Sequence, residues 1–272
     1  MIISPPKWKD PALKIPDGAE AFSTVNPNGH KIPAWFYKGE DKRGTIILCH
    51  GHGAESREFA PLIPVLLKMK IGILLCDFRA HGKAGGWFTP IGKYEWIDLK
   101  SVIDKAVQNG FLKTGEPIVA YGRSMGAALL ANGSSKLPEI NGFILESCFA
   151  ELRIAATRDA KRLFNLSDSF IIDLVFIISQ LVTGYEYYSN KPIESVVGIA
   201  SRPLLLIHDG KDPRATDQDF ERFRKKMPAA EILIVPEANH VQSFSVAPLE
   251  FEAKLRGILS MSGLNPAKPQ SL

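Results

Sequence analysis

The stretch Tyr121-Gly122-Arg123-Ser124-Met125-Gly126-Ala127 carries the pattern Gly-x-Ser-x-Gly between an apolar run, residues 117–121, and a helix-forming run, residues 127–132. A strand, this pattern and a helix in succession are the setting of a nucleophile elbow, a tight turn that exposes a serine hydroxyl at the end of a sheet. Glycines are needed on both sides because a Cβ there would meet the neighbouring strand and helix. The turn also directs the free N–H groups of the helix N-terminus toward whatever is bound to the Ser124 oxygen.

A nucleophilic serine needs a base within hydrogen-bond reach, and the base needs an orienting carboxylate. Without these partners the pattern is an ordinary glycine-rich turn. In this kind of site the acid and then the histidine follow the serine in the chain. Two histidines follow Ser124: His208, which is interpreted as a strand-end residue, and His240, which lies in a loop after the apolar run 232–235. Because mobile, exposed imidazoles belong in such loops, His240 is the predicted base.

The acid is expected in the loop after the apolar run 203–208, which reads Asp209-Gly210-Lys211-Asp212-Pro213. Two carboxylates compete for the role. Asp212 is favoured because the loop first turns at Gly210 and can then reach back to the histidine. Asp209 follows the strand closely and is expected to cap the turn, although it remains the alternative acid.

Acyl transfer also needs N–H donors for the oxyanion. One is predicted to be the backbone N–H of Met125, the residue after the nucleophile. The second is expected from the loop His50-Gly51-His52-Gly53-Ala54, which follows the strand expected at 45–49, and His52 is the predicted donor. The His-x-His spacing could instead indicate a metal ligand pair. No carboxylate or third histidine stands beside it, so no metal is predicted.

Apolar runs and helical patterns alternate along the chain, which favours an α/β fold with a mostly parallel central sheet and helices on both faces. In such sheets the site lies at the carboxyl ends of the strands. An N-terminal hairpin is expected at 21–26 and 32–37, and further strands at 45–49, 72–76, 117–121, 142–147, 203–208 and 231–235. Helices are expected at 57–68, 95–109, 126–136, 215–227 and 246–260.

The stretch between the strands expected at 142–147 and 203–208 is too long for one crossover helix. Residues 150–200 are therefore expected to form a helical lid or cap insertion within a single domain of residues 1–272. Its segment 151–164 is amphipathic, and its segment 170–182 is strongly apolar. The apolar segment either packs against the body or forms an acyl-binding wall. The candidate pocket residues are Phe170, Phe176, Ile177 and Leu181, with Trp87 and Phe88 on a loop near the site.

Across roughly residues 20–260 the chain resembles the α/β-hydrolase superfamily, most of all small bacterial carboxylesterases and cinnamoyl-type esterases. Five segments carry the resemblance in the expected order: His50-Gly51-His52-Gly53, Asp77-Phe78-Arg79-Ala80-His81-Gly82, Gly122-Arg123-Ser124-Met125-Gly126, His208-Asp209-Gly210-Lys211-Asp212 and Ala238-Asn239-His240.

The resemblance implies that Ser124 is the nucleophile, Asp212 the acid and His240 the base, with His52 and Met125 as oxyanion donors. It gives Asp77, Arg79 and His81 a structural role in their loop. One departure is Asp209, where the family usually has glycine after the strand-end histidine.

The expected function is a serine hydrolase that cleaves carboxylic esters through an acyl-enzyme and needs no cofactor. A thioesterase or a peptidase with the same triad is the near alternative, and a non-catalytic α/β-hydrolase scaffold is the more distant one. The substrate is expected to be a small ester or acyl compound. The sequence does not indicate the oligomeric state.

The 272 residues, 45% hydrophobic and 23% charged, suit one large α/β domain. The net charge of +4 is spread along the chain without a basic tract, so no nucleic-acid partner is expected. The start lacks the pattern of a signal peptide, and the apolar run 170–178 is interrupted by Asp173 and is too short to span a membrane. The cytoplasm is the expected location. Cys49, Cys76 and Cys148 are expected to be reduced, buried thiols.

Overall fold

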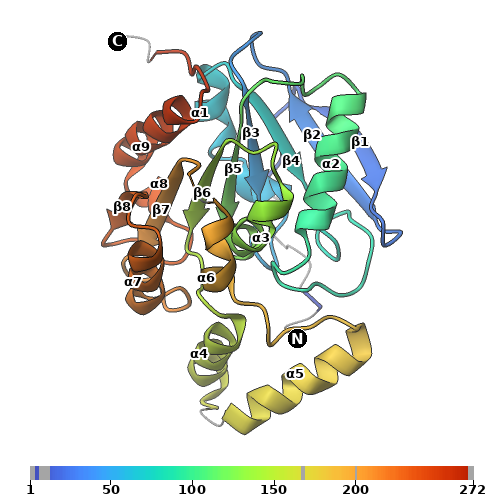
Figure 1. Ribbon diagram of the computed structural model, residues 1–272, viewed down its shortest axis with the longest axis vertical. Coiled ribbons are helices and arrows are strands. Elements are labelled where there is room, and N and C mark those ends of the chain that lie inside the picture. The colour runs from blue at the N-terminus through green and yellow to red at the C-terminus, as the bar shows by residue number, and fades with distance from the viewer. Residues whose placement is uncertain (1–3, 6–12, 167–168, 200, 269–272) are drawn as a thin grey trace.

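The computed structural model describes residues 4–5, 13–166, 169–199 and 201–268 (Figure 1). Within these residues one eight-stranded sheet has the order β1-β2-β4-β3-β5-β6-β7-β8. Strand β2 pairs antiparallel with both β1 and β4, and β3 to β8 run parallel to one another. The strands are β1 Glu20–Val25, β2 Lys31–Tyr37, β3 Thr45–Cys49, β4 Gly72–Cys76, β5 Ile118–Arg123, β6 Gly142–Glu146, β7 Leu204–Asp209 and β8 Glu231–Val235. The predicted mostly parallel sheet is confirmed.

Helices cover both faces of the sheet because alternate residues of the central strands point to opposite sides. In β3, Ile47 and Cys49 belong to the core that packs against α2, α3 and α7, whereas Ile46 and Leu48 belong to the core under α1 and α9. The helices are α1 Ile63–Lys68, α2 Trp96–Gln108, α3 Met125–Gly133, α4 Leu152–Phe164, α5 Ser169–Thr183, α6 Pro192–Ser195, α7 Asp217–Lys226, α8 Ser243–Val246 and α9 Pro248–Met261. Short 3₁₀ turns are η1 Ser56–Phe59, η2 Ser134–Lys136 and η3 Val196–Ile199.

The prediction of one continuous helix over 57–68 is wrong. The segment divides into η1 and α1. Pro61 and Pro64 lie at the division, and neither has the N–H that would bond the carbonyl four residues earlier. The other four predicted helices are present with shifts of a few residues at their ends.

Three helices, α4, α5 and α6, are inserted between β6 and β7, and Figure 1 shows α4 and α5 projecting beyond the carboxyl ends of the parallel strands. An ion pair of 2.6 Å between Arg153 and Asp173 joins α4 to α5. One stripe of α5, including Ile172 and Phe176, is buried, and Phe176 packs against the ring of Tyr188. The opposite face exposes large apolar side chains: Phe170, Ile171, Leu174, Val175, Ile177, Ile178, Leu181 and Val182.

In the part of the chain that the structure describes, no helix combines the length and the apolar character needed to traverse a lipid bilayer. The three cysteines are buried free thiols, as predicted. Burial raises the pKa of the Cys76 and Cys148 thiols well above its ordinary value, so neither supplies a thiolate near neutral pH.

The two faces of α5 should respond differently to truncation. Phe176 is 2% exposed and Leu181 is 80% exposed. We expect Phe176→Ala to lower the free energy of unfolding by about 3–5 kcal/mol because it leaves a cavity. Leu181→Ala should change it by less than about 0.5 kcal/mol. Urea denaturation of the two variants measures the difference, and equal losses would contradict the described packing of α5.

Candidate active site

Ser124 stands in a strained turn between β5 and α3. Its φ of 51° and ψ of −109° lie outside the regions that residues other than glycine favour. A Cβ on Gly122 would lie 2.4 Å from the Gly126 carbonyl carbon, and one on Gly126 would lie 2.0 Å from the Cys49 carbonyl oxygen. The Ser124 N–H donates to the Glu146 carbonyl at 2.9 Å, which fixes the turn to β6. Both glycines of the motif are therefore required by the backbone contacts around them.

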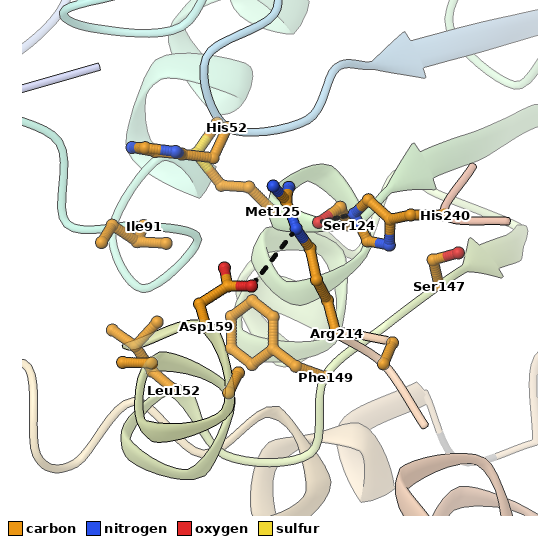
Figure 2. Close-up of a pocket in the computed structure, with 13 residues that line it drawn as sticks. His52, Ile91, Ser124, Met125, Ser147, Phe149, Leu152, Asp159, Arg214 and His240 are labelled. Atoms are coloured by element: carbon orange, nitrogen blue, oxygen red, sulfur yellow. Dashed lines mark hydrogen bonds and ion pairs between the residues drawn. The ribbon is translucent and has the colours of Figure 1, made fainter. Parts of the chain in front are cut away.

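The Ser124 hydroxyl lies in a hydrogen-bonded chain with the two partners that the sequence predicted. Its Oγ is 2.9 Å from Nε2 of His240, and Nδ1 of the same imidazole is 2.7 Å from Oδ2 of Asp212. A carboxylate only accepts, so Nδ1 carries the hydrogen and Nε2 is left to accept the serine proton. Figure 2 shows the His240 ring directed at Ser124. The arrangement can activate a hydroxyl as a nucleophile.

The Asp212 carboxylate is buried and its second oxygen is also bonded. Oδ1 accepts the backbone N–H groups of Arg214 at 2.8 Å and Ala215 at 3.1 Å. Burial alone would raise the pKa of this carboxyl, but the hydrogen bond and the charge of His240, with the two N–H donors, hold its pKa below the ordinary value. Asp212 therefore stays ionised and fixes the orientation of the imidazole.

The alternative acid, Asp209, lies elsewhere. Its side chain is fully buried and accepts hydrogen bonds from the hydroxyl of Ser147, the hydroxyl of Ser243 at 2.6 Å and the N–H of Val241 at 3.1 Å. The structure thus brings Asp212, and not Asp209, to the histidine.

The two predicted oxyanion donors line the same cavity as Ser124. Met125 is the first residue of α3, and His52 belongs to the loop after β3. That loop is held by the carboxylate of Glu58, which accepts the Gly51 N–H at 2.9 Å. The His52 ring packs edge-on against His81. Among the described residues no group of three or more potential ligands is placed to hold a metal ion.

A cavity of about 160 Å³ opens beside Ser124 (Figure 2). Its apolar wall comes from Ile91, Phe149 and the first turns of α4, where Leu152, Ala155 and Ala156 face inward. Arg214 and Asp159 add the charged part of the lining, with Arg214 Nε 3.5 Å from Asp159 Oδ1. The site therefore combines a nucleophile with a small apolar space that carries one ion pair.

The cavity beside Ser124 does not include the pocket residues predicted from the sequence. As far as the described residues define it, the cavity wall contains none of Trp87, Phe88, Phe170, Phe176, Ile177 and Leu181. Trp87 is 83% exposed, and Phe88 packs against the main core. The residues on α5 either face solvent or, like Phe176, are buried against the chain that follows α5. The wall belongs to α4, whose amphipathic pattern in 151–164 was the available signal.

The loop after β4 has the structural role expected of it. Arg79 and Asp98 form a fully buried ion pair of 2.6 Å. Asp77 accepts the backbone N–H groups of Ser56 and Lys83, each at 2.9 Å. Burial lowers the pKa of His81 to about 3, so its imidazole is neutral at physiological pH.

The family model described as serine aminopeptidase, S33, matches residues 40–191. The chain is 26% identical to YqkD of Bacillus subtilis (strain 168), an uncharacterized protein, over 228 residues, 83% of this chain and 74% of YqkD. Among solved structures, the Pyrococcus furiosus esterase Pf2001 is 25% identical with a TM-score of 0.74, covering 96% of this chain and 98% of the esterase. The Pyrococcus horikoshii acylaminoacyl peptidase shares the fold, with 14% identity, a TM-score of 0.66 and coverage of 93% of this chain and 42% of the peptidase.

The glycine contacts at the Ser124 turn can be tested against a matched glycine. A methyl group on Gly126 meets the β3 backbone, whereas one on Gly257 of α9 meets nothing within 4 Å. We expect Gly126→Ala to destabilise the protein by several kcal/mol through overpacking. Gly257→Ala should raise the free energy of unfolding by about 0.5–1 kcal/mol because alanine favours the helix. Thermal and urea unfolding measure both, and a Gly126→Ala protein as stable as the parent would refute the close backbone approach.

The Asp212 charge should make stability depend on pH in a defined direction. Since the folded state lowers the pKa of this carboxyl below its unfolded value of about 3.9, its stabilising effect is complete above that value. It is lost as the pH falls through the lowered pKa. Asp212→Asn should therefore unfold more easily than the parent at pH 7, and the difference should shrink below about pH 4. Urea denaturation from pH 3 to pH 7 measures it. A difference that does not change with pH would contradict this role for the charge.

Proposed function

The chain belongs to the serine aminopeptidase S33 family of α/β-hydrolases and is a hydrolase, and we propose that it cleaves carboxylic esters by way of an acyl-enzyme. The observation that carries the proposal is the hydrogen-bonded chain from Ser124 through His240 to Asp212 beside an apolar cavity. The likeness to the Pf2001 esterase over almost the whole of both chains supports an ester substrate.

In the proposed reaction His240 Nε2 removes the Ser124 proton while Oγ attacks the ester carbonyl carbon. The carbonyl oxygen becomes an oxyanion that the N–H groups of His52 and Met125 stabilise. When the tetrahedral intermediate collapses, the imidazolium gives its proton to the leaving alkoxide, and the alcohol departs. Water then loses a proton to His240 and attacks the acyl-enzyme, and Ser124 regains its proton as the acid leaves. Asp212 stabilises the imidazolium in both halves.

The cavity favours small, apolar acyl groups. Leu152, Ala155, Ala156 and Phe149 offer hydrocarbon contacts next to the nucleophile, and the space of about 160 Å³ limits the length of the chain. Because α4 supplies most of this wall, the inserted helices would set acyl specificity, which is the role proposed for residues 150–200 as a lid.

Hydrolysis of a peptide bond is the second candidate, favoured by the aminopeptidase description of the family. The same triad would serve, with an amine in place of the alcohol as leaving group. Comparison of kcat/KM on an ester and on an amide with the same acyl group separates the two candidates. A higher value on the amide would replace the proposal.

The proposed nucleophile can be tested with p-nitrophenyl esters of two to sixteen acyl carbons. We expect the parent to turn over the shorter esters best, because the cavity is small. Ser124→Ala should lower kcat by about 10⁵–10⁶-fold since it removes the proposed nucleophile. Ser135→Ala, on the short turn after α3, is the matched control and should behave as the parent.

Two results would contradict this proposal. Ester turnover that survives in Ser124→Ala would exclude Ser124 as the nucleophile. A folded parent that hydrolyses no ester and does not react with a fluorophosphonate would favour a non-catalytic scaffold.

A further inference from the structure

The residue that follows the proposed base has a strained backbone. Val241 has a φ of 56°, in the left-handed region that a β-branched residue rarely adopts. A relaxed Val241 would rotate its peptide link to His240 and move the imidazole away from Ser124. Since β8 ends at Val235, the loop that carries His240 is not held by sheet pairing. The Gln242 N–H bond to the Asn239 carbonyl at 3.0 Å closes the turn around His240 and Val241, and the Val241 N–H itself needs a further acceptor.

The Asp209 carboxylate provides this acceptor. It lies at the end of β7, is fully buried, and its Oδ2 accepts the Val241 N–H at 3.1 Å, while the Ser147 hydroxyl oxygen lies 3.3 Å from the same nitrogen as a second acceptor. The same oxygen accepts the hydroxyl of Ser147 from the end of β6. The other oxygen, Oδ1, accepts the hydroxyl of Ser243 at 2.6 Å. A carboxylate makes stronger hydrogen bonds than a neutral acceptor, and this one joins the end of β6 to residues 241–243.

We propose that Asp209 is a positioning residue for catalysis, whose carboxylate holds the strained Val241 peptide and thereby aims His240 at Ser124. The inference rests on the proposed function, since it assigns His240 the part of the base. Asp209 acts through the backbone and does not touch the reacting atoms. A displacement of His240 by about 1 Å would be enough to slow the reaction about 100-fold.

The central test compares Asp209→Ala and Asp209→Asn. The alanine variant loses the charged acceptor and leaves Val241 only the Ser147 hydroxyl, which loses its own bond to the carboxylate. We therefore expect kcat on a p-nitrophenyl ester to fall about 100-fold while KM changes less than about threefold. The asparagine variant keeps an oxygen for Val241 and turns its NH₂ toward the Ser243 hydroxyl, so kcat should stay within about fivefold of the parent. Asp209→Ser, whose hydroxyl is too short to reach Val241, replaces the alanine variant if that variant does not fold.

A second background isolates the strain at Val241. Glycine adopts a positive φ without cost, so Val241→Gly should need the carboxylate less. In that background Asp209→Ala should lower kcat about tenfold or less. Ser243→Ala is the matched stability control because it removes a bond to the other oxygen of the same carboxylate. It should lower Tm as Asp209→Ala does, with kcat within about twofold of the parent.

A spectroscopic readout makes the test independent of turnover. The low-field proton resonance of His240 Nδ1–H, assigned by its loss in His240→Gln, reports the bond to Asp212. It should persist in Asp209→Asn, disappear in Asp209→Ala and return when Val241→Gly is added. The proposal is overturned if Asp209→Ala leaves both the resonance and kcat unchanged. It is also overturned if Asp209→Ala lowers kcat equally in the parent and in Val241→Gly. A parent that neither hydrolyses esters nor reacts with a fluorophosphonate overturns the proposed function instead, and the resonance still decides the role of Asp209.

Discussion

The close approach of α3 to the end of β3 is the constraint on which the site depends. Only glycine at position 126 lets the two backbones meet, since a Cβ there would lie 2.0 Å from the Cys49 carbonyl oxygen. The contact accompanies the sharp turn at Ser124 and places Met125, the first residue of α3, at the cavity that His52 also lines. The placement of the proposed nucleophile, and of Met125 beside it, therefore depends on one packing contact between main chains.

The arrangement of the parallel strands could be predicted because their sequences are continuous apolar runs, which occur where both faces are covered. The carboxyl ends of such strands meet at one edge, so residues far apart in the chain converge there. Asp212 is predicted as the acid in preference to Asp209 because the loop turns at Gly210. The structure shows why glycine is needed at this turn: a Cβ at Gly210 would lie 2.6 Å from the Pro236 carbonyl oxygen. That contact packs the acid loop against the loop that carries His240.

The cavity beside Ser124 could not be predicted, because the hydrophobicity of a side chain indicates that it avoids water and does not indicate which neighbours it contacts. The apolar stripe of α5 packs Phe176 against Tyr188, leaving the rest of the helix exposed. The cavity wall uses Ala155 and Ala156 of α4, whose short side chains leave space rather than fill it. The amphipathic pattern of 151–164 indicates that one face of α4 is buried, but small residues on that face do not indicate a cavity. Only the packing of α4 over the strand ends shows it.

Strained backbone gathers at the same edge of the sheet. Ser124, Ser147 and Val241 all have φ between 51° and 56°, and each such residue costs on the order of 1–3 kcal/mol. Two of the three, Ser147 and Val241, are hydrogen bonded to the Asp209 carboxylate, and the third donates its N–H to the carbonyl of Glu146. The polar groups beneath the site thus offset the strain where it arises. A buried carboxylate that lost these hydrogen-bond donors would destabilise the fold, and so would the donors without their acceptor. The strained turns and their acceptors are therefore stable only together.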